Sequence, residues 1–477
     1  MRQINEIFSQ SVAQMDVALG CGKNFDVVRK KILIGSRIEA VVYGINSFGN
    51  SELIEQIIEY MIRNESLAGA MEKGEEEFLK KAIPFAESGV ENDIEKAVYF
   101  VLSGTLAIVI KGIENIVIVD TRRYSTRSVG EPANDKVLRG PREGFIESLV
   151  VNTGLIRRRI RDTFLRIEKR TVGKRTKTDI ALCYIQGKAD PKLLKSIQDS
   201  LLKLNVDGIN MGLESVAEML IGKRWYNPFP RIRYTERPDA ACAMIMEGSV
   251  VLLCDNYPSA MILPTTFFSF TQDTNDFYFT PFIGKYLKTV RLVVYAVSLL
   301  LTPLWYLLIS TPEIIPQWLL FIIPEGEENI PILLQLIGVE ICIDGLKLAS
   351  LNAPDTMSNS LGIIGGLLLG DFAVSVGWLC ESVIFYMSFV AIANFTQPNF
   401  ELGYAFKFMR MITLALTGAF HLWGFIAGIV LTCAAIVTTP TLKGAPSYLY
   451  PLIPFDKRAL LKVMSRISLD KCQKNDQ

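Results

Sequence analysis

Hydrophobic residues are distributed unevenly along the chain. Up to about Tyr286, short apolar runs alternate with charged stretches, whereas residues 287–439 are mostly apolar. Five runs in this second part are candidate membrane segments: residues 287–309, 331–350, 361–379, 382–395 and 411–438. A helix needs roughly 20 residues to cross the apolar core of a bilayer. The pattern therefore predicts an α/β soluble N-terminal region of two small subdomains, followed by a polytopic α-helical membrane domain.

The third of these segments, LGIIGGLLLGDFAVSVGWL, carries a regular placement of glycine. Gly362, Gly366 and Gly370 are four residues apart, and Gly377 follows one heptad later. On a helix these positions share one face, where small residues allow another helix to approach closely. The segment therefore predicts a membrane-embedded helix with a glycine packing face. Asp371 is its one ionisable residue.

The polar first part of the chain has patterns of both strand and helix. Residues 31–45 (KILIGSRIEAVVYGI) are rich in β-branched residues around a glycine, which predicts a β-hairpin. Residues 51–64 repeat with a helical period. Further along, residues 144–161 have the spacing of an amphipathic helix, and Asp190-Pro191 is expected to open another helix after a strand.

These patterns suggest where one domain ends and the next begins. We expect soluble subdomains over residues 1–136 and 137–284, a membrane domain over 285–439 and a basic tail over 440–477. The first thirty residues hold no apolar run long enough for a secretory signal, so we expect the front part to stay in the cytoplasm. The tail has seven Lys or Arg against three Asp, which also predicts a cytoplasmic location.

With both ends of the chain inside, the number of crossings must be even, yet there are five candidate segments. Residues 331–350 are our choice for the segment that does not span simply, because Glu340, Asp344 and Lys347 lie at i, i+4 and i+7 on one helical face. Residues 382–395 are the other candidate, as a short re-entrant segment. Charged side chains in such a segment line water or pack inside an assembly.

Acidic residues in the apolar part are the candidate functional groups. Glu340, Asp344 and Asp371 are the expected ion path, and because acids outnumber Lys347 here, cations should be preferred. The alternative for residues 331–350 is an intrahelical pair between Asp344 and Lys347 at an interface, without a transport role.

A basic cluster occupies residues 157–177, with ten Lys or Arg against two acids. It is either a solvated face that pairs with acids elsewhere, a subunit interface, or a contact for anionic lipid or nucleic acid. Interleaved aromatic residues typical of nucleic-acid binding are missing, so we expect no nucleic-acid partner.

Residue types that support catalysis are sparse. The eight cysteines show no metal-ligand spacing, and His421 is the single histidine of the chain, inside the last apolar segment. We therefore expect neither an enzyme nor a metal site or cofactor, and interpret His421 as a helix-packing residue, with proton handling as the alternative.

Three stretches together resemble a known family: RGPREGFIESLVVNTGLIRRRIR, LGIIGGLLLGDFAVSVGW and IANFTQPNFELGYAFKFMRM. They are similar to the A-subunit family of bacterial spore germinant receptors, the GerA family, and GKNFDVVRKKI and ELGYAFKFMR look closest to its branch called SpoVAF. Where receptors of the family carry an REA-like stretch, this chain reads DGLKLAS, which favours that branch.

The resemblance implies a multi-pass protein of the inner spore membrane that assembles with copies of itself, with other spore membrane subunits and with membrane lipid. The first of the three stretches then becomes the candidate for assembly or gating (Arg139, Gly140, Pro141, Gly144 and Phe145). Two functions compete. One is an oligomeric, cation-permeable germination complex; the other is a non-conducting scaffold that assembles germinant receptors or dipicolinate-release proteins.

Overall fold

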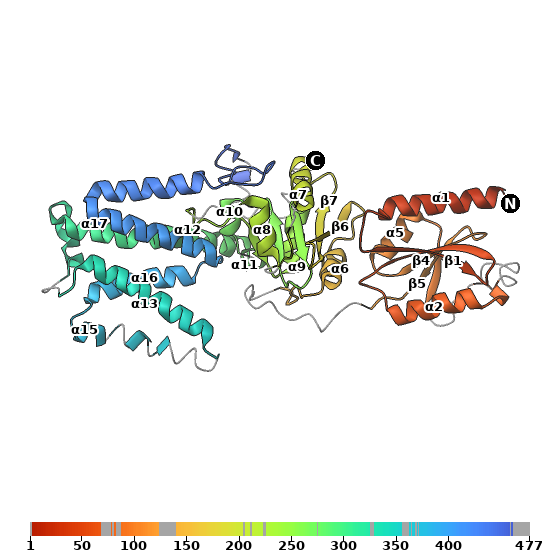
Figure 1. Cartoon of the computed structure of the whole chain (residues 1–477), viewed down its shortest axis with the longest axis horizontal. Coiled ribbons are helices and arrows are strands. Elements are labelled where there is room, and N and C mark those ends of the chain that lie inside the picture. The colour runs from red at the N-terminus through yellow and green to blue at the C-terminus, as the bar shows by residue number, and fades with distance from the viewer. Residues whose placement is uncertain are drawn as a thin grey trace. The chain divides into compact units, whose positions relative to one another are not determined.

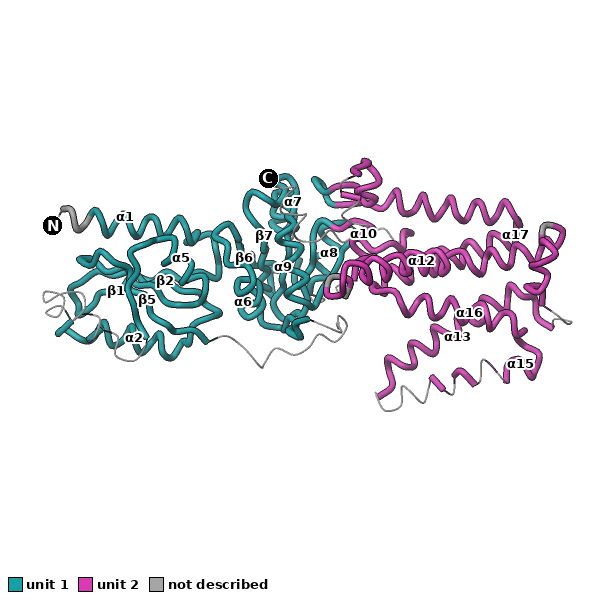
Figure 2. Tube along the Cα trace, turned by 180° about the vertical axis from the view of Figure 1, so that it is seen from behind, with its two compact units in different colours: residues 1–223, 232–264, 442–445 teal, residues 224–231, 265–441, 446–477 magenta. Residues whose placement is uncertain are grey.

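The structure is a computed structural model that forms two compact units. One unit holds residues 1–223, 232–264 and 442–445, and the other holds residues 224–231, 265–441 and 446–477 (Figure 2). The residues described are 2–67, 78, 81–82, 87–123, 140–203, 206–209, 212–222, 226–273, 275–324, 329–354, 362–363, 365–367, 370, 372–457 and 459–460.

The first sheet has five antiparallel strands in the order β1-β2-β4-β5-β3 (Figure 1). Its elements are α1 (Arg2–Leu19), β1 (Val27–Ile34), β2 (Ile38–Ile45), α2 (Ser51–Arg63), β3 (Ser88–Glu91), α5 (Ile94–Leu102), β4 (Leu106–Ile110) and β5 (Ile116–Val119). The hairpin predicted over residues 31–45 is confirmed as β1 and β2. Gly35 turns it with φ +52°, where an added Cβ would lie 3.0 Å from the backbone oxygen of Asn64.

Helices cover both faces of this sheet. On one face, Ile57 and Met61 of α2 pack against β-strand residues such as Ile108. On the other face, α1 and α5 pack their side chains onto β2, β4 and β5. Both sets alternate along the strands, as a sheet with two buried faces requires. The strand order leaves β1 and β3 at opposite edges.

The second sheet is also antiparallel, in the order β6-β7-β9-β10-β8. Its elements are α6 (Leu149–Arg159), β6 (Leu165–Val172), β7 (Thr178–Ile185), α7 (Pro191–Leu202), α8 (Leu213–Ile221), β8 (Arg233–Thr235), α9 (Pro238–Met246), β9 (Val250–Cys254) and β10 (Ala260–Leu263). Asp190 caps α7 as predicted, since its side chain accepts a hydrogen bond from the Lys192 N–H at 2.7 Å. Helices α6 and α9 pack on one face, and α7 and α8 on the other.

A residue from far along the chain completes the core of the second sheet. Leu442 is buried among the side chains of α7, α8 and the sheet, with Ala445 packed against the same cluster. Gly444 follows with φ +87°, and an added Cβ would lie 2.9 Å from the Leu193 nitrogen. The chain therefore returns to the first unit after residue 441.

The other unit is helical. Its elements are α10 (Phe267–Phe270), α11 (Asn275–Tyr278), α12 (Pro281–Ser310), η1 (Pro312–Ile314), η2 (Gln317–Ile322), α13 (Ile332–Asn352), α15 (Ala373–Ser375), α16 (Glu381–Phe395) and α17 (Phe400–Val437). Within the described residues, α12 and α17 are the two helices long and apolar enough to cross a membrane, and α16 is a shorter apolar helix.

Helix α17 folds back on itself at His421, which has φ 49° and ψ −126°. An added Cβ on Gly428 would lie 2.6 Å from Cγ2 of Thr413, and Gly424 is similarly close to the Leu416 backbone. The two arms thus run side by side as a helical hairpin, visible in the two views (Figures 1 and 2). The prediction of one continuous helix over residues 411–438 is wrong, because the backbone reverses within it.

Candidate functional site

A cluster of buried charges joins α13 and α17 within the helical unit. The Glu340 carboxylate receives Lys407 Nζ at 2.9 Å and Arg410 Nη2 at 2.7 Å on the same oxygen, Oε1. Lys407 Nζ also lies 2.5 Å from Asp344 Oδ2. Because one lysine reaches both acids, Glu340 and Asp344 share one face of α13, as their spacing predicts. Two acids and two cations form a neutral group.

Burial separates the two acids. The side chains of Glu340, Lys407 and Arg410 are almost completely buried, whereas that of Asp344 is 37% exposed. A buried charge is tolerated when it is paired and hydrogen-bonded. Glu340 is thus the internal anchor of the cluster, and Asp344 is its rim.

The second side of Arg410 is held by α12 and α16. Its Nη1 donates to the Ser298 backbone oxygen at 2.5 Å and lies 3.2 Å from the Ser298 hydroxyl oxygen. The Ser298 hydroxyl donates to Asn394 Oδ1 at 2.9 Å. The cluster therefore ties four helices of the unit together.

Lys347 is not paired with Asp344 in the way that the alternative reading of this segment requires. Its Nζ lies 4.6 Å from the centroid of the Tyr404 ring and 5.0 Å from that of Phe400. A cation over aromatic faces is stabilised by the ring quadrupole. Lys407 takes the place beside Asp344 instead.

The sequence interpretation missed the two cations that matter most. Lys407 and Arg410 stand three apart within ELGYAFKFMR, so they share a helical face directly before an apolar segment. This three-residue spacing of the two cations is the sequence feature that could have identified them. The comparison of acids with Lys347 left out these two residues, which balance Glu340 and Asp344. The expected preference for cations stays a prediction.

The glycine segment differs from the predicted single helix. Gly377 has φ +76° and lies in a turn, so it does not share a helical face with the other three. Added Cβ atoms on Gly362, Gly366 and Gly370 would meet nothing within 4 Å, whereas one on Gly365 would contact Leu346. The stripe thus has no partner helix within the described part of one chain. Asp371 lies outside the described residues.

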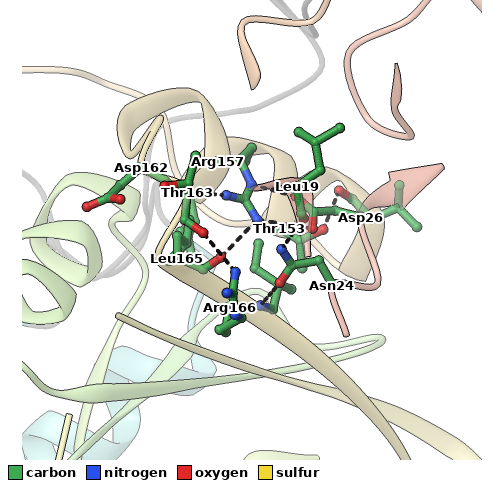
Figure 3. A network of polar contacts seen from close by, with 12 residues as sticks. Leu19, Asn24, Asp26, Thr153, Arg157, Asp162, Thr163, Leu165 and Arg166 are labelled. Atoms are coloured by element: carbon green, nitrogen blue, oxygen red, sulfur yellow. Dashed lines mark hydrogen bonds and ion pairs between the residues drawn. The ribbon is translucent and has the colours of Figure 1, made fainter. Parts of the chain in front are cut away.

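A second buried ion pair lies in the α/β unit, where it joins the two sheets (Figure 3). Arg157 of α6 donates from Nε to Asp26 Oδ2 at 2.7 Å, with Nη2 3.2 Å from Oδ1. Its remaining N–H groups point to the backbone oxygens of Asp162 and Leu165 at 3.3 and 3.4 Å. Nearby, Asn24 accepts from the Ile167 N–H at 3.1 Å. These contacts fix the loop before β1 onto β6.

Other members of the basic cluster over residues 157–177 also have acidic partners. Arg158 and Arg159 lie within 3.4 and 3.0 Å of Glu143, and Lys169 pairs with Asp179 at 2.9 Å. This arrangement agrees with the interpretation of a solvated face that pairs with acids elsewhere.

The candidate assembly stretch is built into the core of the second sheet. Phe145 is buried among α6, α9 and the strands, and its N–H donates to the Glu236 oxygen at 2.7 Å. The Pro141 oxygen accepts from Arg237 Nη2 at 3.1 Å, Gly140 has φ +123°, and Gly144 is buried. Arg139 lies outside the described residues. A role of this stretch in assembly stays a prediction.

Comparison with known proteins places nearly the full length of the chain in one family. Residues 16–477 match the family described as Bacillus/Clostridium GerA spore germination protein. Stage V sporulation protein AF of Bacillus subtilis (strain 168) is 34% identical over 451 residues, covering 94% of this chain and 90% of that protein. Spore germination protein KA of the same organism is 30% identical over 454 residues, covering 94% and 82%.

A solved structure is also among the matches. It is the crystal structure of the N-terminal domain of the A subunit of the Bacillus megaterium spore germinant receptor GerK3, with 22% identity and a TM-score of 0.41, covering 54% of this chain and 94% of that one. The resemblance carried by the sequence motifs is confirmed by the family match over nearly the full length. This chain belongs to the GerA family of spore germination proteins.

Proposed function

We propose that this protein acts in spore germination as an oligomeric, cation-permeable membrane protein of the inner spore membrane. Its helical unit crosses the bilayer several times, with the α/β unit and the C-terminal tail on the cytosolic side. The apolar helices α12 and α17 support a membrane location, and the names of the relatives support the process. Other spore membrane subunits and membrane lipid are its expected partners.

The observation that carries the proposal is the charge cluster of Glu340, Asp344, Lys407 and Arg410. Ionisable groups within an apolar helical unit are costly, and they commonly mark ion or proton pathways. Asp344 is the exposed member of the cluster. In an assembly its carboxylate would face either a water-filled path or a neighbouring subunit, with Lys407 and Glu340 behind it.

Pairing decides what the cluster does to an ion. Lys407 lies between the two carboxylates, so a cation that approaches Asp344 competes with an ammonium already in place. Without the Asp344 charge, the Lys407 ammonium is the charged group closest to the exposed side of the cluster. Cation passage should therefore fall, because the local potential becomes positive.

Ion flux from liposomes tests this proposal. The full-length protein is reconstituted and K⁺ efflux is recorded for the unchanged chain, Asp344→Asn and Asp371→Asn. Glu313→Gln is the matched control, since Glu313 is an exposed acid of η1 away from the cluster. We expect flux from the unchanged protein and the control, and a several-fold lower flux from Asp344→Asn. Liposomes that stay tight with the unchanged protein contradict the proposal.

A specific observation favours the second candidate, the non-conducting scaffold. The three buried groups of the cluster, Glu340, Lys407 and Arg410, are all paired, and Arg410 also binds α12. A cluster that only holds the helices together requires no contact beyond these. On this alternative, Asp344→Asn leaves both the mass of the complex and the tightness of the liposomes unchanged.

A further inference from the structure

The first sheet has two open edges. β1 pairs with β2 and β3 pairs with β5, and within the described residues neither strand has a second partner strand. Val28 of β1 is 44% exposed and Val90 of β3 is 46% exposed. An unpaired edge presents free N–H and C=O groups that another strand can bind. Each edge is thus a possible docking surface.

The two edges carry opposite charge. β1 reads VVRKKILI and presents Arg29, Lys30 and Lys31 on its exposed part, whereas Glu87 and Glu91 flank and end β3. Among the described residues, Lys30 and Lys31 form no ion pair, and Arg29 pairs with Asp16. Two β1 edges would repel each other, as would two β3 edges. A β1 edge and a β3 edge attract.

The match extends to each face of the sheet. Ile32 lies on the α2 face, so by alternation Val28 and Lys30 share that face while Arg29 and Lys31 lie on the α1 face. Val90 is opposite Val117 on the α2 face, and Glu91 is opposite Ile116 on the α1 face. A β3 strand placed beside β1 with the faces aligned therefore sets valine against valine and acid against base.

Strand direction determines the kind of contact. Each neighbouring pair in the order β1-β2-β4-β5-β3 is antiparallel, so the two edge strands run in the same direction. A second copy in the same orientation would bring its β3 alongside β1 as a parallel neighbour. Such a contact joins two different surfaces and repeats from copy to copy, so it generates a ring when the rotation closes.

A groove beside β1 leaves room for the partner's side chains. It has a volume of about 1,020 Å³ and lies between α1 and the hairpin of β1 and β2. Apolar side chains of α1 and the strands line it, including Val12, Leu33 and Val41. Its charged lining is four cations, Arg29, Lys30, Lys31 and Lys111, and two acids, Asp16 and Glu39, of which Asp16 pairs with Arg29 and Glu39 with Lys111. An apolar groove with cations beside it suits a strand that carries both valine and glutamate.

We propose that copies of this chain join head to tail through the first sheet, the basic β1 edge of one copy against the acidic β3 edge of the next. This inference rests on the oligomeric state in the proposed function and names the surface that builds it. It assigns assembly to the α/β unit, independently of whether the helical unit conducts ions.

Disulfide trapping tests the contact in the full-length protein in lipid nanodiscs. The double variant Val28→Cys and Val90→Cys puts one thiol on each edge, and mild oxidation should give a ladder of dimers, trimers and larger species on non-reducing gels. Each single variant is a matched control that also reports background from the native cysteines, of which Cys342 and Cys433 are exposed. The controls should show no ladder above that of the unchanged protein.

Charge exchange tests the specificity. Lys31→Glu alone and Glu91→Lys alone reverse one charge on the α1 face of each junction, and we expect each to raise the protein concentration needed for assembly about tenfold or more. The double variant should assemble as the unchanged protein does, because each junction regains one opposite pair. Lys195→Glu on α7, an exposed lysine of the second sheet's domain, is the control and should change nothing.

The outcomes separate this inference from the proposed function. An oligomer that conducts K⁺ but gives no ladder with the cysteine pair overturns the edge contact and leaves the proposed function standing. A ladder with tight liposomes supports the edge contact and contradicts ion passage. A monomer in nanodiscs overturns both, and an assembly insensitive to both charge reversals overturns the edge contact.

Discussion

Two buried charge clusters of this molecule, one from each unit, are built differently. In the α/β unit, Arg157 and Asp26 form one pair with 0% and 2% exposed side chains, completed by backbone oxygens. In the helical unit, one Glu340 oxygen binds two cations, and Asp344 is the exposed member of the group. A sealed pair can only hold two parts together. A cluster with one exposed carboxylate can also exchange the cation that this carboxylate binds.

The largest effect is expected from breaking the cluster at its centre. Glu340→Ala leaves Lys407 and Arg410 buried with only Asp344 to balance them. Losing one partner of a buried pair costs about 3–5 kcal/mol, and here two cations lose their partner, so the cost should exceed that range. Thermal unfolding in detergent, followed by loss of the monodisperse peak, measures it. Glu313→Ala is the control, and an equal melting temperature for the two variants would contradict the assignment of Glu340 as the anchor.

The sealed pair should respond less strongly, because only one cation is stranded. Asp26→Ala is expected to lower the free energy of unfolding by about 3–5 kcal/mol, with the Asp162 and Leu165 oxygens still binding Arg157. The shift in denaturant midpoint measures this. Lys169→Ala, which breaks a half-exposed pair with Asp179, should cost about 0–1 kcal/mol.

A double replacement sharpens the contrast between the two clusters. Asp26→Leu with Arg157→Met removes both charges together, and swapping a buried pair for apolar groups is often neutral. If the pair serves only as a joint, stability and ion flux should both return to those of the unchanged protein. A double variant as unstable as Asp26→Ala would show that shape, not charge alone, holds the joint.

The hairpin of α17 should respond in the opposite direction. His421 holds φ 49° and ψ −126°, a backbone conformation that costs a non-glycine residue about 1–3 kcal/mol. His421→Gly should therefore raise the melting temperature of the helical unit. His421→Ala keeps the Cβ and the strain, so it should not. A gain from alanine equal to that from glycine would place the effect in the imidazole rather than in the backbone.

The smallest effect concerns thiol chemistry. Burial raises the pKa of the Cys242 thiol to about 12, against the lowering effect of the Arg159 charge, and burial raises the pKa of the Cys183 thiol further. At pH 8 both should stay protonated and resist iodoacetamide in the folded protein, and both should react once denaturant has unfolded the α/β unit. Peptide mass spectrometry reads out each site. Early labelling of Cys183 would mean that the α/β unit opens locally.

Local patterns in the sequence were sufficient for much of the α/β unit. The hairpin of β1 and β2 and the capped start of α7 depend on residues close to one another, and both are confirmed. Turns, helix caps and the alternation of apolar and polar residues along a strand each depend on a few neighbouring residues, so they can be predicted from the sequence. The same reasoning found Glu340 and Asp344 as a pair on one face.

The sequence alone did not predict the long-range ion pairs or the reversal of the backbone in α17. Arg410 meets Glu340 across 70 residues, and Arg157 meets Asp26 across 131. No local pattern encodes these distances, so counting charges segment by segment left out Lys407 and Arg410. The α17 hairpin was missed because its turn residue is His421, with neither glycine nor proline at the reversal, and apolar residues continue on both sides.

The return of the chain to the second sheet has a practical consequence for protein production. A truncated expression product that stops at Pro264 contains every strand of both sheets but lacks Leu442 and Ala445, which fill the core between α7 and α8. Such a fragment would expose an apolar cavity to water and invite aggregation. Appending the short segment 442–445 by a flexible linker should restore its solubility. The half of the protein that precedes the helices is thus finished only by residues that follow them.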